Sequence, residues 1–318
     1  MSFLDDHTTC GCCGFHATEA ALNLMSLQQI ERSLLDYAGL ERIMRDENPD
    51  APFVPSEVAL TELLAENANK LAGRVEGRIH DALDRHGYVN EAAITAALVS
   101  ANSTWQNEAW PRDLENNYRV KLAQTALLGA HEISFGSELA DLDRLRIVNG
   151  MAKSAKYYTN GYFNNQVMPA VVDAVHSAVL NGATPDGEEL NAIRALLDRR
   201  LRSVPYWNLV ANAAASRAYH YGYLKAGIAS GLATVQFVAI IDERTSAICI
   251  SMNGTQWRAQ DVALLADRIA DAEGDAVKEI APWVKPTDIA GMSSGDLLAM
   301  GVVIPPLHGR CRSQLFFV

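Results

Sequence analysis

Residues 304–313 gather a histidine, a cysteine and two arginines between a pair of prolines and a final apolar run. The stretch reads IPPLHGRCRS, with His308 and Cys311 three residues apart. Imidazole nitrogen and thiolate sulfur at such a spacing are typical zinc ligands, and guanidinium groups bind carboxylates and phosphates. The stretch therefore predicts a metal site, an anionic or DNA partner held by Arg310 and Arg312, or a loop that only closes the fold.

A second concentration of soft ligands lies near the N-terminus, in the sequence HTTCGCCGFH. Such a density of thiols and imidazoles can bind zinc, although two adjacent cysteines rarely both reach one tetrahedral centre. The alternatives are a segment that takes up metal only in vitro and one that docks on a partner. We treat residues 1–16 as a separate Cys/His-rich segment, with five candidate ligands: His7, Cys10, Cys12, Cys13 and His16.

Charged residues follow the apolar run at 235–241, which is rich in β-branched side chains and predicts a strand buried on both faces. The sequence there is Asp242-Glu243-Arg244-Thr245. We expect Asp242 to cap a short helix through residue 249, with Glu243 in its first turn. A catalytic role for these residues is the alternative.

Arg217 falls on the apolar face of a helix predicted over residues 206–228, in line with Tyr206, Val210 and Tyr221. A buried guanidinium requires a carboxylate or several carbonyl groups, and Asp242 and Glu243 are the nearest candidates along the chain. In the alternative, the arginine extends along the apolar surface to reach water.

Gly291-Met-Ser293-Ser-Gly295 matches the pattern of hydrolase nucleophiles, which requires a strand directly before it. The preceding Lys285-Pro-Thr-Asp is no strand, so we expect a loop into a Ser-capped helix over residues 294–300. The sequence has no His-Glu-x-x-His, P-loop or dinucleotide fingerprint, and we expect no enzyme.

The elements that position these residues are of two kinds. From residue 17 to 231 the periodicity is helical and predicts six or seven helices, with breaks at Trp110-Pro111, Met168-Pro169 and residues 184–187. Beyond it we expect strands at 235–241, 255–257 and 314–318, with a helix near 259–270. The predicted fold is a mainly α N-terminal region followed by a small α+β C-terminal domain.

The bulk composition limits the partners. The chain has 318 residues and a net charge of −11, which allows two domains and argues against a protein that coats nucleic acid. No apolar run approaches the ~18 residues that span a bilayer, and MSFLDDHTTCGCCG lacks the features of a signal peptide. We expect no membrane partner and reduced thiols in a cytoplasm.

An ordered series of motifs over residues 205–318 resembles the phage minor head proteins of the Mu F-like head morphogenesis family. The series is Arg217, Gly222, Gly231, Asp242-Glu243-Arg244-Thr245, Cys249, Asn253-Gly254, Trp257 and Pro305-Pro306-Leu-His308-Gly-Arg310-Cys311-Arg312.

The resemblance implies a virion protein present in few copies, located inside the head near the portal and in the host cytoplasm during assembly. It would act in head morphogenesis and in DNA packaging or ejection. The implied partners are the portal protein, a major capsid or scaffolding protein, and packaged double-stranded DNA. Residues 17–204 would be the variable helical part that engages the portal or capsid.

The family pattern often reads Cys-x-x-Cys in its first motif and Cys-Arg-Cys in its last, and here Ser246 and Ser313 replace two of those cysteines. Cys249, His308 and Cys311 remain, so zinc would need Asp242 or water as its fourth ligand. We therefore favour a packed latch that ties the tail to the Asp242 turn, with zinc as the alternative cofactor. Two rival functions stay open: a toxin-like or nucleotide-modifying enzyme, and a zinc-dependent nucleic-acid-binding module.

Overall fold

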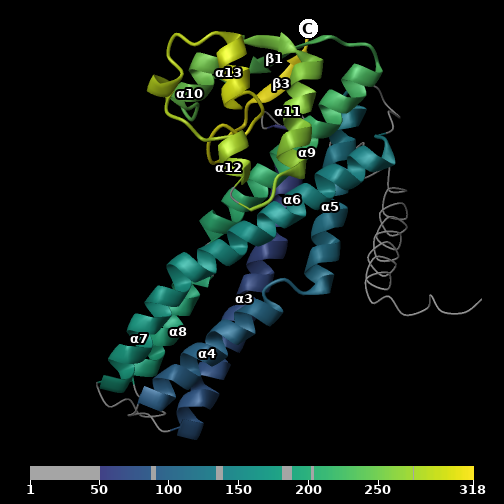
Figure 1. Ribbon diagram of the computed structural model, residues 1–318. Helices are drawn as coiled ribbons and strands as arrows, with labels where there is room; N and C mark the ends of the chain where they lie inside the picture. The colour runs from purple at the N-terminus through teal and green to yellow at the C-terminus, as the bar shows by residue number, and fades with distance from the viewer. Residues whose placement is uncertain (1–50, 87–90, 134–138, 181–187, 202–203, 275) are drawn as a thin grey trace, which may run out of the picture. The chain divides into compact units, whose positions relative to one another are not determined.

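The computed structural model describes residues 51–318 except 87–90, 134–138, 181–187, 202–203 and 275 (Figure 1). Contacts between Cα atoms divide the chain into residues 1–46 and 47–318, and the described residues all belong to the second unit. This unit is mostly helical, with a small antiparallel sheet near the C-terminus, which confirms the predicted fold class. The predicted helix that starts near residue 17 lies outside the described residues.

Helices make up the described chain up to the first strand. Their amphipathic patterns place apolar side chains every three or four residues on the inward face, as in α3, where Leu60, Leu64, Leu71 and Val75 are buried. In order, the elements are α3 (Val54–His86), α4 (Glu91–Glu108), α5 (Arg112–His131), α6 (Asp141–Tyr162), η1 (Phe163–Val167), α7 (Met168–Leu180), α8 (Glu188–Leu201) and α9 (Val204–Ala229).

Of the predicted helix boundaries, the one at Trp110-Pro111 separates two helices and the one at Met168-Pro169 does not interrupt the helical chain. Pro111 stands at the N-cap of α5 and separates it from α4, as expected. Met168-Pro169 falls where α7 begins, but the chain stays helical there, because α6 continues through the π-helical turn η1 directly into α7. Pro169 lacks the N–H of a helical hydrogen bond and directly follows the π turn, where the α-helical hydrogen-bond pattern is already interrupted.

Helix α9 packs against α3, α5 and α6 and also contacts β3 (Gln314–Phe317) and α11 (Ala259–Asp271). Its approach to α5 is close: a Cβ atom added at Gly222 would lie 1.7 Å from the Ala126 carbonyl oxygen. Glycine is therefore required at this crossing. The predicted domain boundary at 204/205 falls where α9 begins, and α9 connects the helices to the C-terminal elements.

The C-terminal elements form a three-stranded antiparallel sheet with helices around it. Strand β1 (Thr234–Val238) lies between β2 (Gln256–Arg258) and β3, with Val235 opposite both Trp257 and Phe317. The other elements are α10 (Ala247–Met252), α11, α12 (Ala276–Ile280), η2 (Pro286–Asp288) and α13 (Ser294–Met300).

The first strand is shorter than predicted and is not buried on both faces. Val235 and Phe237 are buried, their neighbours in β1 are only partly buried, and Ile241 beyond the strand is 60% exposed. The apolar run therefore reflects one core-facing side plus a partly covered side. The helix predicted at 294–300 is confirmed as α13, and the one at 259–270 as α11, one residue longer.

The sheet is attached to the C-terminal end of α9 (Figure 1). The Phe317 N–H donates to the Tyr223 hydroxyl at 3.1 Å, and a Cβ atom at Gly227 would lie 2.0 Å from the Phe317 ring. Within the described part of the chain, no helix is both long and apolar enough to pass through a bilayer.

Candidate functional site

The turn after β1 is closed by Asp242 and Thr245. The Asp242 carboxylate accepts the Arg244 N–H at 2.9 Å, and the Asp242 N–H donates to the Thr245 hydroxyl at 2.7 Å. The predicted helix cap is wrong in one respect: Ser246, not Asp242, caps α10 by accepting the Cys249 N–H at 3.4 Å. Glu243 is exposed and precedes the helix rather than lying in its first turn.

Arg312 ties the tail to this turn. Its guanidinium donates to the Asp242 carboxylate at 2.6 Å, with the arginine side chain 16% exposed and the aspartate 35%. This hydrogen bond, together with the Arg244 N–H, holds the pKa of Asp242 well below its usual range. The expected connection between tail and turn is thus present, and Arg310 is the exposed cation of the pair.

Three soft ligands meet beside this latch. The Cys249 sulfur lies 3.2 Å from His308 Nε2 and 3.6 Å from the Cys311 sulfur, and all three ligand atoms lie within 4.8 Å of one another. Cys311 is fully buried and Cys249 is 2% exposed. Residues 59 and 62 positions apart in the chain therefore form one cluster, which we call the thiol cluster.

The protons of the thiol cluster are unevenly shared. A hydrogen bond from the Cys311 thiol, and then one from His308, lowers the pKa of Cys249, whereas the same contact and burial raise the pKa of Cys311. Contact with Cys249 raises the pKa of His308. Cys249 is the sulfur that most readily becomes a thiolate, which is the form that binds metals and attacks electrophiles.

Ser246 and Ser313, which stand where the resemblance to the Mu F-like pattern predicts cysteines, lie next to the same sulfur. Hydrogen bonds from Ser246 and Ser313 contribute to lowering the pKa of Cys249. A shallow pocket that the two serines share with Cys249 and His308 has a free volume of about 10 Å³, enough for one water or one ion. The His308 Nδ1 faces the Gly309 carbonyl at 2.7 Å, an outer contact that orients metal-binding histidines.

The residues present thus fit three positions of a tetrahedral zinc site. The sequence predicts Asp242 or water as the fourth ligand. Asp242 does not supply it, because its carboxylate is held by Arg312 and lies outside the thiol cluster. Water or a serine oxygen is the remaining ligand. Zinc bound there would hold the tail against α10 and, with an open position, would act as a Lewis acid.

Two further motif positions serve the backbone. Gly254 adopts a φ of 86° in the turn before β2, and its N–H joins this turn to β1 by donating to the Phe237 carbonyl at 2.8 Å. The Pro305–Pro306 peptide bond is cis and leads into the tail. Ser293 caps α13 in a capping box with Asp296, as expected from the sequence.

Arg217 lies on α9, away from the latch. Asp242 binds Arg312, and within the described residues neither it nor Glu243 pairs with Arg217, so the predicted carboxylate partner is wrong. The alternative of an arginine that reaches solvent is also wrong, because the side chain is 7% exposed. Arg217 instead lines a pocket with residues that the sequence did not single out: Tyr158, Lys278 and Trp283.

Polar contacts between α6, α9 and α11 were also missed. The Tyr221 hydroxyl donates to Asp267 at 2.8 Å, and Lys225 contacts the same carboxylate at 2.9 Å. The only sequence signal was the amphipathic pattern of residues 259–270, which gives no partner. The five N-terminal candidates, His7, Cys10, Cys12, Cys13 and His16, lie outside the described residues.

Comparison of the chain with protein-family models finds no match, and comparison with curated proteins and with solved structures finds none either.

Proposed function

We propose that the chain is a phage minor head protein that acts at the portal vertex in head morphogenesis and in DNA packaging or ejection. The observation that carries this proposal is the meeting of the motif residues in one place. Asp242 and Thr245 come from the turn after β1 and Cys249 comes from α10, whereas His308, Cys311 and Arg312 come from the tail. Together they form the latch and the thiol cluster.

The distribution of charge is consistent with this role. Arg310 is exposed at the latch, and from residue 297 to the C-terminus the chain has no Asp or Glu. In a chain of net charge −11, this gives one small basic area for packaged DNA or an acidic portal surface. The helices before α9 would supply the contacts with the portal or capsid protein.

The test is made on particles of the phage or prophage whose genome encodes the chain. We expect the protein in purified particles at few copies, and we expect deletion of its gene to yield heads that lack DNA or do not infect. Complementation with the wild-type gene restores infectivity, and complementation with Arg310→Ala restores it less well. Infectious, DNA-filled heads after deletion would overturn the proposal.

The enzyme alternative is tested on the same particles with Glu243→Gln and His308→Gln. Neither variant removes the Asp242–Arg312 bond, so the latch is retained. An enzyme would lose an activity while assembly stays intact. We expect instead that each variant loses assembly and infectivity only to the extent that its C-terminal tail fails to fold.

One observation favours the second candidate function, a zinc-dependent nucleic-acid-binding module: three zinc-type ligand atoms converge in the thiol cluster. Elemental analysis of the purified chain and of Cys249→Ser tests the metal. One zinc per chain in the wild type and none in the variant would support this function. DNA binding that weakens steeply with salt would have to accompany it.

A further inference from the structure

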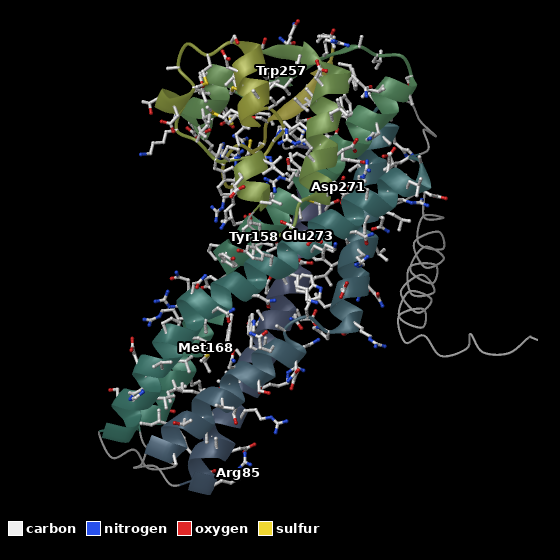
Figure 2. The ribbon with its side chains drawn as sticks, viewed as in Figure 1. Arg85, Tyr158, Met168, Trp257, Asp271 and Glu273 are labelled. Atoms are coloured by element: carbon white, nitrogen blue, oxygen red, sulfur yellow. The ribbon has the colours of Figure 1, made fainter. Side chains whose placement is uncertain are left out.

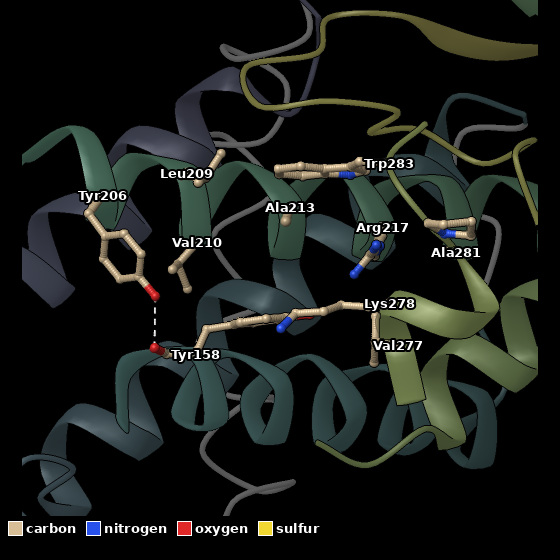
Figure 3. Close-up of a pocket in the computed structure, with 11 residues that line it drawn as sticks. Tyr158, Tyr206, Leu209, Val210, Ala213, Arg217, Val277, Lys278, Ala281 and Trp283 are labelled. Carbon is tan, nitrogen blue, oxygen red and sulfur yellow. Dashed lines mark hydrogen bonds between the residues drawn. The ribbon is translucent and has the colours of Figure 1, made fainter. Parts of the chain in front are cut away.

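A pocket of about 370 Å³ lies between α6, α9 and the segment that begins with α12 (Figure 3). Its volume is within the range of small-molecule sites, about 300–1,000 Å³. Tyr158 comes from α6, Tyr206, Val210, Ala213 and Arg217 come from one face of α9, and Lys278 and Trp283 come from α12 and the segment after it. Figure 2 shows Tyr158 where α6 passes the C-terminal elements.

Arg217 is the unusual member of the pocket. Its side chain is 7% exposed, its Nε has no hydrogen-bond partner, and no carboxylate or carbonyl among the described residues pairs with it. Figure 3 shows the guanidinium directed into the cavity, between Trp283 and Lys278. Burial lowers the pKa of Arg217, which reflects the energetic cost of an uncompensated buried charge.

Two cations of α6 outside the pocket have carboxylate partners, which Arg217 lacks among the described residues. Arg146, on the same helix as Tyr158, contacts Asp267 and Asp271 at 3.1 Å each, and Lys153 contacts Glu273 at 2.9 Å. The pocket lining, in contrast, contains Arg217 and Lys278 and no Asp or Glu. In an acidic chain, this leaves a cavity whose charged groups are all positive.

The aromatic side chains of the lining are held in place, and the other uncharged lining residues are aliphatic. The Trp283 indole N–H donates to the Pro306 carbonyl at 3.0 Å, and the Tyr206 hydroxyl donates to the Tyr158 carbonyl at 2.7 Å. Lys278 lies over the Tyr158 ring at 5.4 Å. Trp283 is 47% exposed, so one wall of the pocket borders the solvent and a ligand has a way in.

We propose that this pocket binds a small organic anion, with a carboxylate or phosphate group on Arg217 and a planar apolar body between Trp283 and Tyr158. A planar anionic group matches the donors of a guanidinium, and the apolar body replaces water along the aromatic walls. The proposal does not depend on the role in the phage head. The anion is a free metabolite or the terminal carboxylate of a protein chain, since both present the same chemistry.

The experiment uses the full-length chain in calorimetric titrations with 1-naphthylacetate, its neutral amide, and N-acetylphenylalanine as a mimic of a chain terminus. We expect saturable binding of at least one acid and at least tenfold weaker binding of the amide. Tighter binding of N-acetylphenylalanine than of naphthylacetate would assign the site to a protein terminus, and the reverse order to a metabolite.

Arg217→Met is the decisive variant, and Arg146→Met is the matched control because Arg146 has carboxylate partners and does not line this pocket. We expect Arg217→Met to keep or raise the melting temperature and to weaken the binding of the acid at least tenfold, with the control binding as the wild type does. Equal binding by Arg217→Met, or no saturable binding of either acid by the wild type, would overturn the proposal. A lowered melting temperature with retained binding would make Arg217 structural.

Discussion

Along α9, the side that faces α5 and the side that faces the pocket differ in how closely they are packed. On the α5 side, an added Cβ at Gly222 would lie 1.7 Å from the Ala126 carbonyl, and one at Gly129 would lie 2.0 Å from the Tyr219 carbonyl. On the pocket side, about 370 Å³ is left open next to Arg217, whose Nε has no hydrogen-bond partner among the described residues. Close packing stabilises the folded state, whereas a cavity and a buried charge destabilise it. The stability of the fold therefore accounts for the α5 side of α9 but not for the pocket side.

The largest effect is expected on the packed side. Gly222→Ala would drive a methyl group into the backbone of α5, which cannot move without moving the helix, and we expect it to lower the free energy of unfolding by about 3 kcal/mol or more. Urea denaturation measures the change. The control is Gly77→Ala on an open face of α3, which we expect to gain about 0.5–1 kcal/mol. A Gly222→Ala protein as stable as the wild type would show that the helices are farther apart.

A second effect of about 2 kcal/mol is expected from His220, which is fully buried on α9. Burial lowers its pKa to about 4, below the 6.5 of an exposed histidine. Between these values the unfolded chain binds a proton that the folded chain does not, so stability falls as the pH decreases from 6.5 to 4. We expect the unfolding free energy to be about 2 kcal/mol lower at pH 5 than at pH 7 on this account.

His220→Leu should remove this part of the pH dependence, and His176→Leu, an exposed position on α7, should not. Denaturation curves at pH 5 and pH 7 for the three proteins separate His220 from the other acid-sensitive groups. The same pH dependence in His220→Leu and in the wild type would contradict the expectation.

A smaller effect of opposite sign is expected on the pocket side. Arg217→Met removes an uncompensated buried charge and keeps most of the side-chain volume, so we expect a gain of about 1 kcal/mol in unfolding free energy. Denaturation of the ligand-free chain measures it. A loss of stability would mean that Arg217 supports the fold, and the contrast between the two sides of α9 would disappear.

The smallest effect is expected at the latch, where the Arg312 guanidinium donates to the Asp242 carboxylate. The lowered pKa of Asp242 means that its contribution is present above the ordinary pKa of an aspartate and is lost as the pH falls below it. Asp242→Asn should mimic this loss at neutral pH. We expect faster hydrogen exchange at the β3 amides and unchanged exchange in α5, and equal exchange in both proteins would contradict a latch.

A structural element was predictable where the local sequence contains the physical cause of that element. The helices α11 and α13 and the Ser293 cap follow from periodicity and capping residues, and they were predicted nearly to the residue. The meeting of tail and Asp242 turn was predicted because the motif residues come in a fixed order. The pocket was not predictable, since Tyr158, Arg217 and Trp283 are brought together only by the packing of segments that share no local pattern.

The π-helical turn η1 explains why the chain stays helical at Met168-Pro169, where the sequence predicted a break. From Thr159 to Val175 buried side chains recur at every fourth position, and on a regular α-helix such a repeat drifts about 40° around the axis at each step. The wider π turn at residues 163–167 takes up part of this drift. One π-helical turn therefore keeps a four-residue repeat on the same buried face through α6 and α7. The members of this repeat are Thr159, Phe163, Val167, Val171 and Val175.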